Sequence, residues 1–81
     1  MQPIFEKEIN GHNFKFLNVK LGGTNEAIYT VEFYYDELRK HQTFEMKMDE
    51  DGQWKIQAQI LPKYVHDAEL ELGNSIEDHE L

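Results

Sequence analysis

The sequence has no cysteine, only two prolines and no long apolar run. Without cysteine the chain can form neither disulfides nor thiolate metal sites, which excludes a small secreted scaffold held together by bridges. No apolar stretch approaches the roughly 18 residues that a membrane span needs. The N-terminus has neither the basic region nor the apolar region of a signal peptide. We therefore expect a soluble, cytoplasmic protein with no membrane association.

A length of 81 residues leaves room for one hydrophobic core and for no second domain. Hydrophobic residues make up 40% of the chain, which is enough to form that core. The charged residues are of both signs, unlike the one-signed composition that is typical of disorder. We expect a single domain over residues 1–81 with modest stability.

Positive charge is scarce, and the deficit is greatest near the C-terminus. The net charge is −8, and residues 62–81 contain six acidic residues against Lys63 alone. Contact with a phosphate backbone requires cations that release bound counterions, so direct nucleic-acid binding is not expected. A basic protein partner fits this charge better.

Alternating apolar and polar residues predict five strands separated by turns. Asn10-Gly11 is a strong two-residue hairpin signal, because both residues tolerate the positive φ of a type I′ turn. Turns are also expected at residues 22–25 and 49–52, with Gly52 in the left-handed region. The expected strands cover residues 4–9, 12–21, 27–35, 42–48 and 53–61.

The apolar phase changes inside the second predicted strand. Phe14 and Phe16 lie at even positions, whereas the following apolar residues, Leu17, Val19 and Leu21, lie at odd positions. A β-bulge near Phe16 and Leu17 would return the apolar residues to one face and bend the strand. In the last predicted strand the inward residues are expected to be Trp54, Ile56, Ala58 and Ile60.

A helix over residues 63–72 is predicted after Pro62, since apolar residues recur there at helical spacing. Gly73-Asn74 is typical of a helix end, and residues 73–81 would then either fray or add one turn capped by Ser75. The predicted fold class is α+β: a five-stranded antiparallel β-meander, with the sheet curved and one C-terminal α-helix packed on it. The helix is expected to cover the apolar face of the sheet.

No pattern in the sequence predicts a catalytic residue, a metal site or a cofactor. Residues 49–52 combine three carboxylates with a glycine, but the ligand spacing and flanking helices of a calcium loop are absent. The histidines lack the spacing of zinc ligands. They are His12, His41, His66 and His79. Ser75, the only serine, is interpreted as a helix cap rather than a nucleophile.

One face of the third predicted strand carries apolar residues that a helix on the opposite face cannot cover. Ile28 and Tyr34 share the parity of Thr30 and Glu32, and either Phe14 or Phe16 would extend them into an exposed patch. The hypothesis is that this patch binds a protein partner or a second copy of the chain. A strongly curved sheet that uses both faces for packing would explain the same residues without any partner.

The leading functional prediction is a small non-enzymatic interaction domain that binds an unidentified protein or forms a homodimer. A second class is a small-ligand binder or enzyme with a pocket between sheet and helix. A third is an acidic inhibitor or nucleic-acid mimic that occupies a basic site on another protein. A mimic would carry carboxylates spaced along one face like phosphates.

Overall fold

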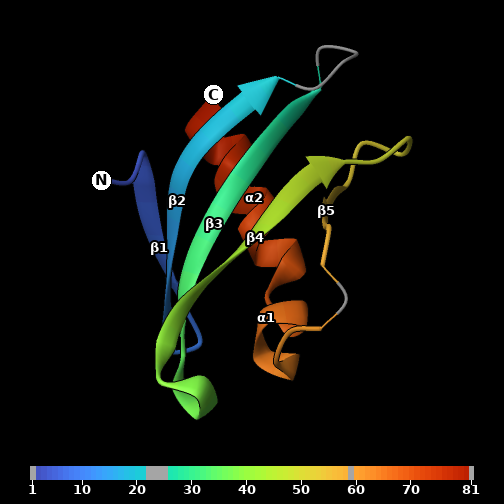
Figure 1. Cartoon of the computed structure of the whole chain (residues 1–81). Coiled ribbons are helices and arrows are strands. Elements are labelled where there is room, and N and C mark those ends of the chain that lie inside the picture. The colour runs from blue at the N-terminus through green and yellow to red at the C-terminus, as the bar shows by residue number, and fades with distance from the viewer. Residues whose placement is uncertain (1, 22–25, 59, 81) are drawn as a thin grey trace.

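The computed structural model of the chain describes residues 2–21, 26–58 and 60–80. In this part of the chain five antiparallel strands form one sheet in the order β1-β2-β3-β4-β5, a meander in which each strand pairs with the next (Figure 1). The predicted α+β fold class is confirmed. The strands are β1 (Phe5–Ile9), β2 (His12–Leu21), β3 (Ala27–Tyr35), β4 (Lys40–Met48) and β5 (Trp54–Ile56).

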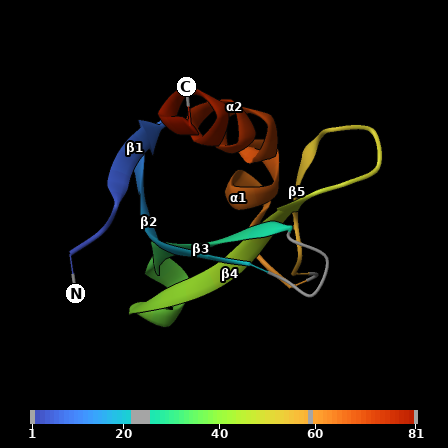
Figure 2. The same ribbon diagram turned by 90° about the horizontal axis from the view of Figure 1, so that it is seen from above.

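The sheet is strongly curved, and the C-terminal helices lie inside the curve (Figure 2). The short helix α1 (Lys63–Asp67) follows Pro62 and leads into α2 (Glu69–Glu80). A single 3₁₀ turn, η1 (Asp36–Leu38), joins β3 to β4. The result is a half-barrel whose concave face packs on α2 and whose convex face points to solvent.

Two predicted turns have the predicted backbone geometry. Asn10 and Gly11 have φ values of 53° and 83°, the paired positive values of a type I′ hairpin turn. Gly52 has a φ of 79° in the turn between β4 and β5. The turn predicted at residues 22–25 lies outside the described residues.

The predicted bulge in β2 is present. Phe16 pairs with Val31 and Asn18 pairs with Thr30, so Leu17 is an extra residue with no partner of its own in β3. Before the bulge, even-numbered residues of β2 face the helix, and after it odd-numbered residues do.

The hydrophobic core lies between the concave face and α2. Phe14 and Phe16 are both 0% exposed and belong to it, so the idea that either reaches the outer face is wrong. Phe16 is opposite the buried Val31 in the register, and the Phe14 ring lies 6.3 Å from the ring of the buried Phe33. The buried residues of the core are Ile9, Phe14, Phe16, Tyr29, Val31, Phe33, Phe44, Met46, Trp54, Val65, Ala68, Leu72 and Ile76.

The helix does not end at Gly73 as predicted but continues to Glu80. Gly73 is instead a position of close approach between α2 and β5, because a β-carbon there would lie 3.0 Å from Trp54 Cβ. Ser75 does not cap a new turn, since its buried hydroxyl donates to the Glu71 carbonyl within α2 at 2.8 Å. Ile76 is 0% exposed, so its burial holds the end of the chain against the sheet.

The fifth strand is shorter than predicted. The Gln57 N–H still donates to the Glu45 carbonyl at 2.8 Å, but the chain then leaves the sheet toward Pro62 and α1. Ile60, predicted to face inward, is 87% exposed. Residue 59 of the predicted strand lies outside the described residues.

Candidate functional site

The convex face does not carry the continuous apolar patch that the sequence predicts. Tyr34 is 45% exposed, whereas Ile28 is half-buried. The two residues are six positions apart along β3, which is roughly 20 Å in an extended strand. Charged pairs occupy the face between them, among them Lys20 with Glu45 at 2.8 Å. Since Phe14 and Phe16 are in the core, Tyr34 and Ile28 are two separate residues rather than parts of one exposed apolar surface.

Tyr34 is bordered by two shallow hollows of about 180 and 170 Å³. The His41 ring lies edge-on to the Tyr34 ring at 5.2 Å, and His41 Nδ1 lies 3.6 Å from a Glu32 carboxylate oxygen. Lys15 is opposite Glu32 in the sheet register, yet the close contact that the Glu32 carboxylate makes is with the His41 ring. The first hollow therefore combines the rings of Phe33 and Tyr34 with charged groups of both signs, Lys15 and Glu32.

The second hollow is closed on one side by Tyr64. Its ring stacks on His12 with centroids 3.9 Å apart, and its hydroxyl donates to the Tyr34 carbonyl at 3.3 Å. Burial, followed by the nearby charge of Asp36, raises the pKa of Tyr64 above its usual value of 10.0. Tyr64 is therefore a neutral hydrogen-bond donor at neutral pH. Its contacts with His12 and the Tyr34 carbonyl join α1 to the sheet.

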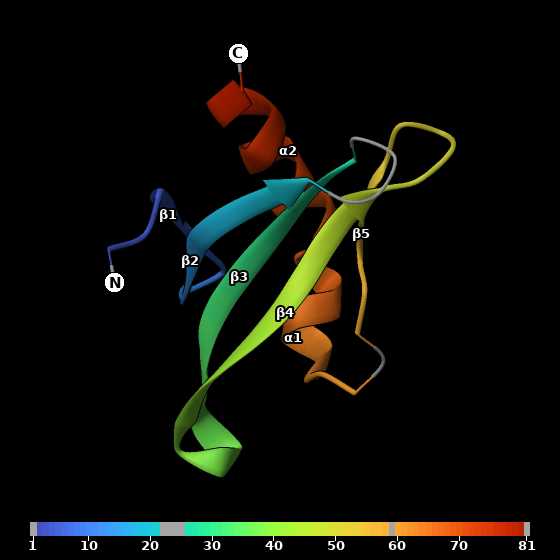
Figure 3. The ribbon, with the colours of Figure 1, turned by 45° about the horizontal axis from the view of Figure 1, so that its top comes forward.

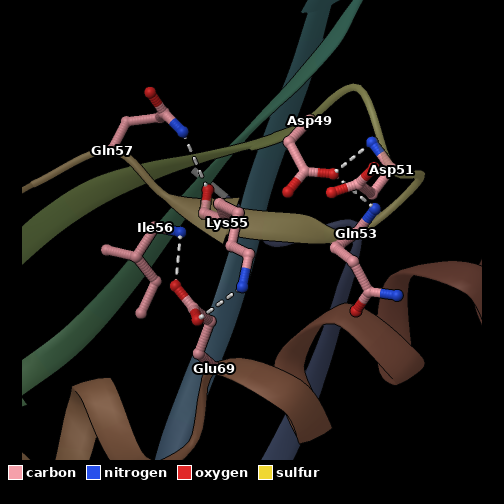
Figure 4. Close-up of polar contacts among 7 residues, drawn as sticks. All are labelled: Asp49, Asp51, Gln53, Lys55, Ile56, Gln57 and Glu69. Carbon is pink, nitrogen blue, oxygen red and sulfur yellow. Dashed lines mark hydrogen bonds and ion pairs between the residues drawn. The ribbon is translucent and has the colours of Figure 1, made fainter.

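In the acidic turn between β4 and β5, the first carboxylate, that of Asp49, accepts hydrogen bonds from the backbone of the turn itself (Figure 4). Asp49 Oδ1 accepts the backbone N–H groups of Asp51 and Gln53, each at 2.9 Å. This pattern explains why an aspartate begins the turn without any metal. Within the described ranges no group of three histidine, aspartate or glutamate side chains is arranged to hold a metal ion.

The outer edge of β5 is blocked by the helix. Glu69 of α2 accepts the Ile56 backbone N–H at 3.0 Å and lies 3.6 Å from the Lys55 ammonium group (Figure 4). An edge strand with unpaired N–H groups can add a strand from another chain, and a carboxylate on such a group prevents this. Strand addition at β5 is therefore disfavoured.

The concave face is left uncovered at one end, where β2 ends and β3 begins. Val19, Leu21 and Met48 point to the helix side of the sheet, yet they are 44%, 72% and 41% exposed. Leu21 pairs with Ala27 in the register, and Val19 pairs with Tyr29. We call the four residues Val19, Leu21, Ala27 and Met48 the apolar shelf. Figure 3 shows the end of β2 and the C-terminal end of α2 at the same, upper end of the molecule.

A hollow of about 360 Å³ adjoins the apolar shelf. Its lining joins the start of β3, the end of β4, the start of β5 and the last residue of α2, namely Glu26, Ala27, Met48, Asp49, Trp54 and Glu80. We call it the acidic hollow, because three of its six residues are carboxylates on an otherwise apolar lining. Sequence reasoning missed this site, since its residues are far apart in the sequence.

The carboxylates of the acidic hollow already have some partners within the chain. Glu80 accepts the Tyr29 hydroxyl at 2.8 Å, and Glu26 lies 3.2 Å from the Lys47 ammonium group. Burial, the hydrogen bond to Glu80 and the charge of Glu80 together raise the pKa of Tyr29 to about 12. The Tyr29 phenol therefore stays protonated at neutral pH and positions the Glu80 carboxylate.

Among the described residues no helix is both long enough and apolar enough to cross a membrane. Comparisons of the chain with protein-family models, with curated proteins and with solved structures find no significant match.

Proposed function

We propose that this chain is a small non-enzymatic interaction domain that binds a basic, amphipathic segment of a partner protein at the apolar shelf and the acidic hollow. The observation that carries the proposal is the exposure of Val19, Leu21 and Met48 on the side of the sheet that elsewhere forms the core. Apolar side chains grouped at the edge of a core, beside charged groups, are typical of protein-binding surfaces.

The chemistry of the partner follows from charge. The shelf adjoins the carboxylates of Glu26, Asp49 and Glu80, and the chain as a whole has a net charge of −8. Such a field attracts a cationic partner and repels an acidic one, and it acts mainly on the association rate. The shelf has few residues, so the expected interface is of modest size and the complex is transient.

The nucleic-acid mimic has less support, because α2 does not carry its carboxylates in one row. At about 100° per residue, Glu69, Glu77 and Glu80 lie within about 80° of one another. Glu71 and Asp78 lie on the opposite side of the same helix. A phosphate backbone presents its charges in a regular line, and this arrangement does not reproduce one.

The test is a nuclear magnetic resonance titration of the ¹⁵N-labelled full chain with two synthetic peptides. One alternates lysine with leucine, and the other alternates glutamate with leucine. Amides of Val19, Leu21, Ala27 and Met48 should shift with the lysine peptide only, and the shifts should weaken as salt is added. Shifts with neither peptide, or equal shifts with both, would contradict the proposal.

A second candidate function is self-association through Tyr34. The exposed Tyr34 ring lies between two hollows, which could receive side chains of a second copy of the chain. Light scattering of the wild type at high concentration would then show a dimer, and Tyr34→Glu would dissociate it. Leu38→Glu is the matched control, since Leu38 is 52% exposed and lines neither hollow. A monomeric wild type would remove this candidate and leave the shelf proposal intact.

A further inference from the structure

The acidic hollow has a volume and a lining that could receive one side chain. Its volume of about 360 Å³ falls in the range of small-ligand pockets, roughly 300–1,000 Å³. It adjoins the apolar shelf, because Ala27 and Met48 belong to both. A chain segment bound on the apolar shelf would therefore lie next to the opening of the acidic hollow. Trp54, which lines the hollow, is only 6% exposed and belongs to the core, so the core holds this part of the lining in place.

The floor of the hollow is apolar. Ala27, Met48 and Trp54 line it from three different strands. The long hydrocarbon stem of a lysine or arginine side chain is stabilised on such a surface while its charged end reaches polar groups. A short cationic group without a stem would leave this floor uncovered.

The rim of the hollow is negative. Asp49 uses Oδ1 for the turn and Glu80 uses Oε2 for Tyr29, and among residues 2–21, 26–58 and 60–80 no partner is found for the other oxygen of either carboxylate. A carboxylate in a partly enclosed site is stabilised by an opposite charge, and hydrogen bonds between charged groups are stronger than neutral ones.

We infer that a single lysine or arginine side chain of the partner enters the acidic hollow, with its stem on Met48 and Trp54 and its charge between Asp49 and Glu80. This inference rests on the proposed function, since it names the residue by which the basic segment is recognised. The flanking apolar residues of that segment would lie on the apolar shelf.

The experiment uses three short peptides with blocked ends that differ in one central residue between leucines. The central residue is lysine, norleucine or glutamate, so that the first two differ in the ammonium group while sharing a hydrocarbon stem. Spermidine serves as a cation without apolar flanks. Binding to the full chain is read from the fluorescence of Trp54, which is the only tryptophan and lines the hollow.

The discriminating variants are Glu80→Gln and Glu71→Gln. Both remove one negative charge from α2, but Glu71 is exposed and is not part of the hollow. Glu80→Gln should weaken binding of the lysine peptide by about three- to tenfold, whereas Glu71→Gln should change it by less than about twofold. The norleucine peptide should bind both variants and the wild type alike.

The possible outcomes distinguish failure of the inference about the acidic hollow from failure of the proposed function. If both variants weaken the lysine peptide equally, the partner is basic but the hollow does not select one side chain, and the inference fails alone. If spermidine binds as tightly as the lysine peptide, the hollow receives small amines rather than a protein segment, and both fail. If no lysine peptide binds even at low salt, the proposed function fails together with the inference.

Discussion

Gly73→Ala tests whether close packing, rather than a helix end, explains the glycine in α2. A β-carbon at this position would lie 3.0 Å from Trp54 Cβ and 3.7 Å from Trp54 Cγ and Cδ1. Carbon atoms pack best at about 3.5–4.0 Å, so α2 and β5 would have to separate by roughly half an ångström. Trp54 Cβ is bonded to the strand backbone and cannot move aside by a change of rotamer.

Two free energies oppose each other in this variant. Alanine is more favourable than glycine in a helix interior by about 1 kcal/mol. Overpacking a well-packed contact costs about 1–3 kcal/mol, so Gly73→Ala should lower the free energy of unfolding by about 0–2 kcal/mol. Gly73→Val should lower it further, because valine loses part of the gain in helix propensity and adds two methyl groups.

The neighbouring substitution Asn74→Ala is the matched control. Asn74 is exposed in the same helix, so alanine there should raise the free energy of unfolding by about 0.5 kcal/mol. Urea denaturation followed by far-ultraviolet circular dichroism measures both variants. Gly73→Ala should be about 0.5–2.5 kcal/mol less stable than Asn74→Ala. Equal stabilisation by both would refute the close-packing explanation.

Four further measurements test other parts of the structure. Trp54 Nε1 is buried with no acceptor among the described residues, so Trp54→Phe should cost clearly less in unfolding free energy than the about 3–5 kcal/mol of Trp54→Ala. The pKa of Tyr29 is raised to about 12, so unfolding free energy should fall as the pH rises from 10 toward 12, because the unfolded chain releases that proton first. Glu80→Gln should lower this pKa in an ultraviolet titration, and Glu71→Gln should leave it unchanged. Calcium, zinc or a chelator should leave the melting temperature unchanged, and a shift of several degrees would show that the acidic turn binds metal.

The strands could be predicted because their apolar residues alternate with a clear phase. The change from Phe16 to Leu17 even indicated the bulge, since only an extra residue reconciles the two phases with one buried face. The hairpin at Asn10 and Gly11 was predictable for a local reason, because positive φ at both positions is a property of those residues themselves.

The end of the helix could not be predicted, because its determinants are tertiary. Gly73 has the local signal of a helix end, but its lack of a side chain serves the contact with Trp54, 19 residues earlier in the sequence. The length of β5 is likewise a tertiary property, because after Gln57 the chain leaves the sheet toward Pro62 and α1 although the apolar alternation of the sequence continues. Long-range contacts of this kind override local propensity and leave no periodic signal.

The predicted apolar patch was placed on the wrong face of the sheet. The parity of a residue in a strand shows which face its side chain lies on, but not whether another element covers that face at that point. Parity correctly puts Tyr34 on the convex face, and it puts Val19, Leu21 and Met48 on the concave face. Residues of the concave parity are ordinarily core, so nothing in the sequence marks these three as exposed. Only the position of α2 along the sheet shows which inward residues remain without a cover.

The apolar shelf follows from the bulge and from the relative lengths of strand and helix. The extra residue Leu17 turns Val19 and Leu21 toward the helix side, where an unbroken strand would place Asn18 and Lys20. The ten residues of β2 extend about 33 Å, whereas residues 63–80, which form α1 and α2, extend at most about 27 Å. Val19 and Leu21, at the end of β2, remain 44% and 72% exposed. The chain thus leaves apolar side chains exposed on the concave face beside the end of its own helix, although polar residues are adjacent in the same strand. Exposed apolar side chains on such a face are costly unless another surface covers them, and the carboxylates beside them favour a basic one.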